Sequence, residues 1–109
     1  MTIVKVRRKA GHIVSVSCMG HTMSAEKGED IVCAALSSVV QTALMGLMEV
    51  AGINVDYTRD DEEGLLLIKL PEGIEDAQRH DADVILHTML CGVSDLSEQF
   101  SKYIKLEVK

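Results

Sequence analysis

The sequence predicts an α+β domain in which a mixed or antiparallel sheet of five strands is covered, mainly on one face, by two helices. Short segments of alternating apolar and polar residues, typical of strands, occur as two pairs and one closing segment. Two long apolar segments with helical spacing separate them, which gives the two-layer order ββαββαβ. A chain of 109 residues can form one such core, so we expect a single domain over residues 1–109. The pattern does not predict the strand order.

The first two strands are expected at residues 2–8 and 13–18, joined by a turn at residues 9–12. Apolar residues of the second strand alternate onto one face, and this face includes Cys18. Because a free cysteine buries readily, we expect Cys18 to be a small core residue. His12 lies in the turn and is expected in solvent.

The first helix is expected at residues 31–51. Asp30 is a good N-cap residue, and Gly52 suits the left-handed position that ends many helices. Within the helix Glu49 is the one charged residue, so the apolar surface extends nearly all round. One face can pack on the sheet, and the remainder requires a second helix or a second subunit. Together with the apolar stripe of the second helix, this surface predicts a homodimer.

This helix is also long enough to cross a membrane. Polar residues interrupt it, however, and a buried core helix with no membrane association is the preferred interpretation. The interrupting residues are Ser37, Ser38, Gln41, Thr42 and Glu49.

A second strand pair is expected at residues 53–58 and 65–70, around an acidic turn. The second helix is expected at about residues 74–100, and the closing strand at residues 103–108.

Three residues of the second helix, His80, Asp83 and His87, can share one face in an arrangement that resembles a helical metal site. Acid-rich first turns are usually solvated faces, so we predict no metal site and no cofactor.

Charge and composition exclude several functions. The net charge is -6 and the aromatic residues are Tyr57, Phe100 and Tyr103, which argues against direct nucleic-acid binding and suits a basic partner. The three cysteines include no Cys-x-x-Cys pair, and no secretory segment begins the chain. We therefore expect a reducing, cytoplasmic environment.

A histidine and a cysteine flank the loop that precedes the first helix. His21 comes before this loop and Cys33 follows it, in the expected first helical turn. Free backbone N–H groups and the positive end of the helix dipole there favour a thiolate over a thiol. If His21 folds back onto Cys33, the two form a nucleophile and its base. Ser37 lies one turn further along, where its hydroxyl could steady the imidazole or the substrate.

The whole segment from Gly20 to Ser37, with Gly-His, a short polar loop and then Gly-x-Asp-Ile-Val-Cys-Ala-Ala-x-Ser, resembles the signature of the bacterial ribosomal-processing cysteine protease family, Prp. The resemblance extends over most of the chain, including residues 90–93 and 98–106. It departs at Thr22, where alanine is frequent, and at residues 100–101, where Tyr-Pro is common.

This resemblance implies a homodimeric, cytoplasmic endopeptidase that removes the N-terminal extension of one large-subunit ribosomal protein, cleaving beside an aromatic residue. It implies that Cys33 is the nucleophile and His21 the general base, with Asp30 and Ser37 in support. The substrate loop would include Gly20, Thr22 and Gly28.

We expect residues 22–29 to be mobile without substrate and ordered with it. Two alternatives stay open from the sequence. One is a non-catalytic, ribosome-associated module that holds a peptide with Cys33 as an inert thiol. The other is a thiol redox or metal protein.

Overall fold

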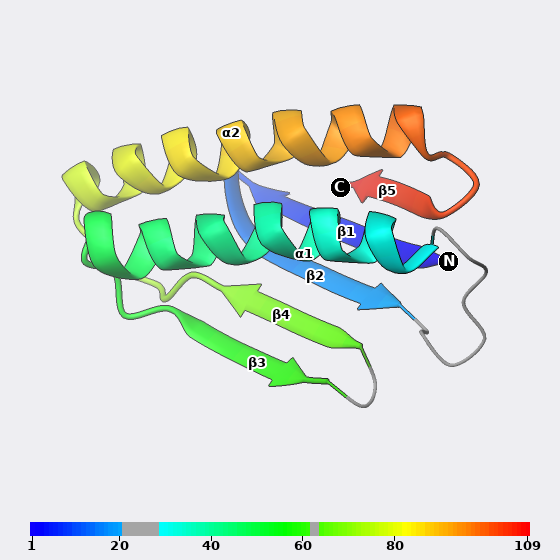
Figure 1. Cartoon of the computed structure of the whole chain (residues 1–109). Coiled ribbons are helices and arrows are strands. Elements are labelled where there is room, and N and C mark those ends of the chain that lie inside the picture. The colour runs from blue at the N-terminus through cyan, green and yellow to red at the C-terminus, as the bar shows by residue number, and fades with distance from the viewer. Residues whose placement is uncertain (21–28, 62–63) are drawn as a thin grey trace.

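A computed structural model describes residues 1–20, 29–61 and 64–109, with the backbone alone at residues 29 and 30. It confirms the predicted α+β architecture, because two helices lie side by side across one face of a mixed sheet (Figure 1). The elements, in chain order, are β1 Thr2–Lys9, β2 His12–Gly20, α1 Glu29–Met45, η1 Gly46–Val50, β3 Asp56–Asp60, β4 Leu65–Lys69, α2 Asp76–Gln99 and β5 Ile104–Val108.

The sheet has the strand order β3-β4-β2-β1-β5. Neighbouring strands are antiparallel except β1 and β5, which are parallel because α2 carries the chain back across the sheet. β1 and β2 are joined by a two-residue turn in which Ala10 and Gly11 both have positive φ, as the favoured tight hairpin requires. β3 is an edge strand, and all of its residues are exposed.

The helices begin and end close to the predicted positions, with one correction that matters for the site. α1 begins at Glu29, so Asp30 lies in its first turn and is not the N-cap, and Cys33 is the fifth helical residue rather than the third. The helical path continues through the π-helical segment η1 to Val50, and Gly52 then adopts the predicted left-handed conformation. At the start of α2, the side-chain oxygen of Gln78 accepts a hydrogen bond from the backbone N–H of Glu75.

The core lies between the helices and the face of the sheet that carries Val4, Val16 and Ile68. α1 and η1 are apolar and long enough to cross a membrane by length and composition, over Ile31–Val50. In this fold the inner side of that helical segment is buried in the core, through Val32, Leu36, Val40, Ala43, Leu44 and Leu47.

The third strand differs from its predicted range. Ile53 and Val55 were expected inside a strand, but β3 begins only at Asp56. Both side chains are buried ahead of the strand, where the chain leaves the helix and turns toward the sheet. Alternating burial in a connecting segment therefore imitated the pattern of a strand.

Candidate active site

A cleft of about 190 Å³ lies between the first half of α1 and the β3–β4 hairpin. The helix contributes one wall and the hairpin contributes the other, while the ends of β1 and β2 form the floor. The lining residues are Thr2, Cys18, Gly20, Cys33, Leu36, Ser37, Val40, Gln41, Arg59, Asp60, Asp61, Gly64, Leu65 and Leu66.

Cys33 is half-buried in this cleft and contacts the start of β1. The hydroxyl oxygen of Thr2 lies 3.3 Å from the sulfur of Cys33, and Thr2 is 5% exposed, so the contact is screened from water. When the sulfur is a thiolate, the Thr2 hydroxyl can donate to it and stabilise the charge. Thr2 is therefore part of the environment of the thiol, although the sequence offered no signal for it.

Two glycines allow this contact. A side chain at Gly20 would place its Cβ 2.4 Å from the Thr2 hydroxyl oxygen, closer than two such atoms can approach. Gly64 has a φ of +63°, and a Cβ there would lie 2.0 Å from the carbonyl oxygen of Gly20. The N–H of Gly20 also donates to the carbonyl of Gly64, at 3.1 Å. The end of β2, the start of β1 and the hairpin are thus packed closely beneath Cys33.

Cys18 is buried, as the sequence predicts, and it also lines the cleft. Burial, and to a smaller extent the negative charge of an ionised Cys33 nearby, raises the pKa of the Cys18 thiol from 9.0 to about 11. Cys18 is therefore a neutral thiol at pH 7. Two cysteines border one cleft, and only the half-buried one lies on the helix at its edge.

The structure brings together three of the predicted site residues, Cys33, Ser37 and Gly20, around this cleft. Ser37 is exposed one turn after Cys33 on the same helix wall. His21, Thr22 and Gly28 lie outside the described residues, as does most of the loop for which ordering on substrate is predicted. The backbone of Asp30 is in the first turn of α1.

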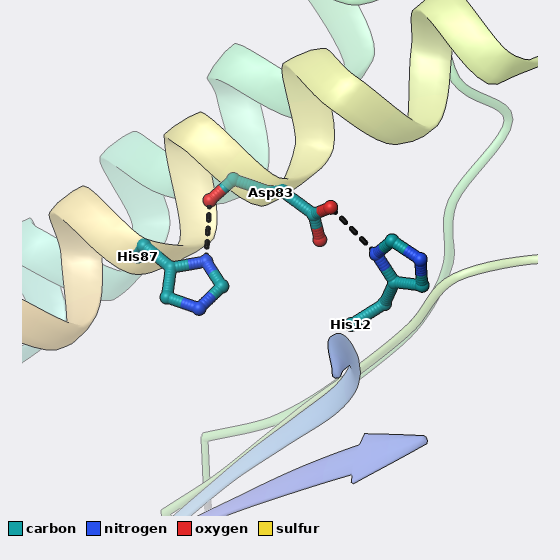
Figure 2. Close-up of polar contacts among 3 residues, drawn as sticks. All are labelled: His12, Asp83 and His87. Carbon is teal, nitrogen blue, oxygen red and sulfur yellow. Dashed lines mark hydrogen bonds and ion pairs between the residues drawn. The ribbon is translucent and has the colours of Figure 1, made fainter. Parts of the chain in front are cut away.

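Asp83 and His87, two residues of the possible metal arrangement on α2, make other contacts in the structure (Figure 2). Asp83 Oδ2 lies 2.6 Å from Nδ1 of His12, and His87 Nδ1 lies 2.7 Å from the backbone oxygen of Asp83. His80 is exposed. Within the described residues, no group of three or more His, Cys, Asp or Glu side chains could hold a metal ion. His12, expected in solvent, instead ties the first hairpin to α2.

Sequence reasoning missed the wall opposite Cys33. The hairpin residues Arg59, Asp60 and Asp61 form a polar rim, in which Arg59 is paired with Asp61 at 2.8 Å. Leu65 and Leu66 form the apolar part of the same wall. The strand pattern predicted the hairpin, but its placement beside α1 depends on the strand order, which no local pattern encodes.

Comparison with known proteins gives a consistent result. Residues 1–105 match the family model described as cysteine protease Prp. The ribosomal processing cysteine protease Prp of Staphylococcus aureus strain Mu50 is 29% identical over 99 residues, which cover 91% of this chain and 90% of the relative.

Two solved structures of an essential ribosomal processing protease Prp from S. aureus are also similar, and each match covers 100% of both chains. The complex with a substrate peptide has a TM-score of 0.88 at 27% identity. The complex with a covalently linked product peptide has a TM-score of 0.84 at 28% identity.

Proposed function

We propose that this chain, which belongs to the cysteine protease Prp family, removes the N-terminal extension of a large-subunit ribosomal protein with Cys33 as its nucleophile. The observation that carries the proposal is the position of Cys33, half-buried at the edge of a cleft between a helix and a hairpin. The S. aureus relatives of the same fold are described with a substrate peptide and with a covalently linked product peptide.

The chemistry follows from the residues around the sulfur. The Cys33 thiolate attacks the carbonyl carbon of the scissile bond, and the amine leaves with a proton, which gives a thioester that water then hydrolyses. Thr2 is placed to stabilise the thiolate before attack, at 3.3 Å from the sulfur. We assign the general base and acid to His21, because it directly follows Gly20, a residue of the same cleft.

The start of α1 limits which groups can stabilise the oxyanion. Because the helix begins at Glu29, the N–H of Cys33 falls in its hydrogen-bonded part. The free N–H groups belong to the first turn, ahead of Cys33. We therefore propose that the first turn of α1, and not the amide of Cys33, supplies any helical donors to the oxyanion.

The cleft suits an extended peptide that carries an apolar side chain. Leu36, Val40, Leu65 and Leu66 give it an apolar interior, which could hold the aromatic residue implied by the family resemblance. Its rim includes Asp60 and Asp61, which favour a basic peptide. Ser37 lies beside Cys33 on the helix wall and is proposed to contact the substrate or orient the base.

We also propose that the protein acts as a homodimer in the bacterial cytoplasm. Large apolar side chains are exposed along the first helical segment, with exposed fractions of 75% at Ile31, 49% at Met45 and 82% at Val50. A second subunit would cover them. Sedimentation at micromolar concentration should give a dimer, and Met45→Glu with Val50→Glu should give a monomer. A monomeric wild-type protein would contradict the proposal.

Incubation with the extended ribosomal protein, followed by mass spectrometry of the products, tests the function. The wild type and Cys18→Ala should release one N-terminal peptide, whereas Cys33→Ala should release none and still bind the substrate. A binding module would bind without cleavage in the wild type as well. Cleavage by purified Cys33→Ala, or an inactive Cys18→Ala, would show that the nucleophile is misassigned.

A further inference from the structure

A second, larger cleft lies at the opposite end of the sheet from Cys33, with a volume of about 750 Å³. Thr2, at the active-site end of β1, and Lys9, at the far end, are separated by roughly 23 Å at 3.3 Å per residue. The second cleft is lined by Arg7, Arg8, Lys9, Ala10, Val14, Ser15, Lys69, Leu70, Pro71, Glu72, Gly73 and Arg79. Five of these residues are basic and one is acidic.

The sheet register explains why the basic residues gather there. Arg7 on β1 and Lys69 on β4 are both cross-strand partners of Ser15 on β2, so their side chains extend from the same face of the two strands that flank β2. Arg8 and Lys9 follow at the end of β1, and Arg79 is half-buried on the first turns of α2. The cleft therefore collects positive charge from two strands and a helix.

These charges are available to a partner. Within the described residues, none of the five basic side chains forms an ion pair or a side-chain hydrogen bond. Nearby acids include Glu72 in the lining and Asp56, which lies opposite Lys69 in the register of β3 and β4. Glu75, the N-cap of α2, and Asp83 also lie four residues before and after Arg79. Clustered like charges repel one another, so the arrangement costs folding free energy and a bound anion would offset that cost.

We propose that this basic cleft docks the phosphate backbone of RNA. Three of the five residues are arginines, whose planar guanidinium groups bind phosphate through two parallel hydrogen bonds. Among the described residues that line the cleft, none is an aromatic residue on which a base could stack. Contacts are therefore made to phosphates and sugars, with little preference for sequence.

The net charge of -6 does not contradict a local site. Most of the acidic residues lie outside the cleft, so the net negative charge of the remaining surface favours RNA binding at that end of the sheet. The expectation that the chain avoids nucleic acid came from its total charge and its few aromatic residues. Neither quantity reveals how five basic residues are grouped.

The inference deepens the proposed function and rests on it for the identity of the RNA. If the substrate is a ribosomal protein, it binds RNA. That RNA is then the polyanion that lies closest to the protease when the protease binds its substrate. Docking at one end of the sheet would leave the cleft at Cys33, roughly 20 Å away, free to receive the N-terminal extension. The protease would then act on its substrate in the RNA-bound form.

Fluorescence anisotropy with a labelled 20-base-pair RNA duplex tests the proposal. The wild type should bind with micromolar affinity, and three to five phosphate contacts on a duplex predict a slope of roughly -3 to -4.5 for the logarithm of affinity against the logarithm of salt concentration. Arg7→Glu with Lys69→Glu should weaken binding at least tenfold and reduce the slope. Lys102→Glu with Lys105→Glu, which makes the same change in net charge outside the cleft, should weaken it less than threefold.

The outcomes separate this proposal from the proposed function. Cleavage of a short free peptide should be unchanged by Arg7→Glu with Lys69→Glu, because both residues lie far from Cys33. RNA binding is measured without cleavage, so the two proposals can fail separately. The protein can cleave the peptide without binding RNA, or bind RNA without cleaving the peptide. Equal loss in the two charge-reversal variants would overturn the proposal, as would tighter binding of a polyglutamate peptide or of phosphatidylglycerol vesicles than of RNA.

Discussion

Replacing Gly20 with alanine tests whether the packing beneath Cys33 is as tight as the structure indicates. The new Cβ would lie 2.4 Å from the Thr2 hydroxyl oxygen and 3.1 Å from the Thr2 Cβ, whereas ordinary contacts begin near 3.4 Å. Thr2 must therefore move by about 1 Å, and overpacking of this kind costs roughly 1–3 kcal/mol. Its hydrogen bond to Cys33 would be lost as well, which adds about 1 kcal/mol. We expect the free energy of unfolding to fall by about 2–4 kcal/mol.

Urea denaturation measures this change, provided that the slope with denaturant stays constant. Gly46→Ala is the matched control, because its Cβ would meet Ile85 at an ordinary 3.6 Å and alanine favours a helix. Thr2→Ala removes the atom nearest to the new methyl group, so the double variant should be less destabilised than the sum by at least about 1 kcal/mol. Additive costs, or a loss below about 0.5 kcal/mol for Gly20→Ala, would refute the reasoning.

Three further predictions concern the thiol of Cys18, the hydroxyl of Thr2 and the contact between Asp83 and His12. The raised pKa of Cys18, about 11 against 9.0, means that the folded protein keeps a proton that the unfolded chain loses. The contribution of the Cys18 thiol to stability is therefore complete below pH 9. The free energy of unfolding should then fall by about 2–3 kcal/mol as pH rises toward 11, and denaturation curves of Cys18→Ala should show no such fall. Thr2→Val should slow peptide cleavage and Cys33 alkylation by roughly fivefold at pH 7, and Thr2→Ser should restore both; an unchanged alkylation rate would show that the hydroxyl does not support the thiolate. Asp83→Asn should lower the free energy of unfolding by up to about 1 kcal/mol because it weakens the half-exposed contact with His12, and the exposed His80→Ala should change it by less; equal effects would contradict the contact.

Local patterns predicted the elements of this fold because each element has its own periodicity. Alternation identified the first hairpin, and an apolar run ending at Gly52 identified the long first helix. Helix starts are less certain, since a good N-cap residue such as Asp30 is equally acceptable one position inside the helix. The resulting shift moves Cys33 from the third to the fifth helical position and changes which N–H groups are free.

The features that complete the site depend on contacts between distant segments. Thr2 reaches Cys33 only because β1 lies under the start of α1, and Asp60 reaches the cleft only because β4 pairs with β2. His12 was expected in solvent because the turn sequence says nothing about Asp83 on α2. The family resemblance supplied the pairing of His21 with Cys33, which spacing alone does not establish.

The central claim is that Cys33 is the nucleophile of the cleft, and covalent labelling tests it most directly. The wild-type protein would be treated at pH 7 with a chloromethyl ketone built on a substrate peptide, and the modified residue would be mapped by tandem mass spectrometry. We predict one adduct per chain on Cys33, suppressed by excess substrate peptide, with Cys18 and the exposed Cys91 unmodified. An adduct on Cys18, or labelling of Cys33 that substrate does not suppress, would contradict the claim.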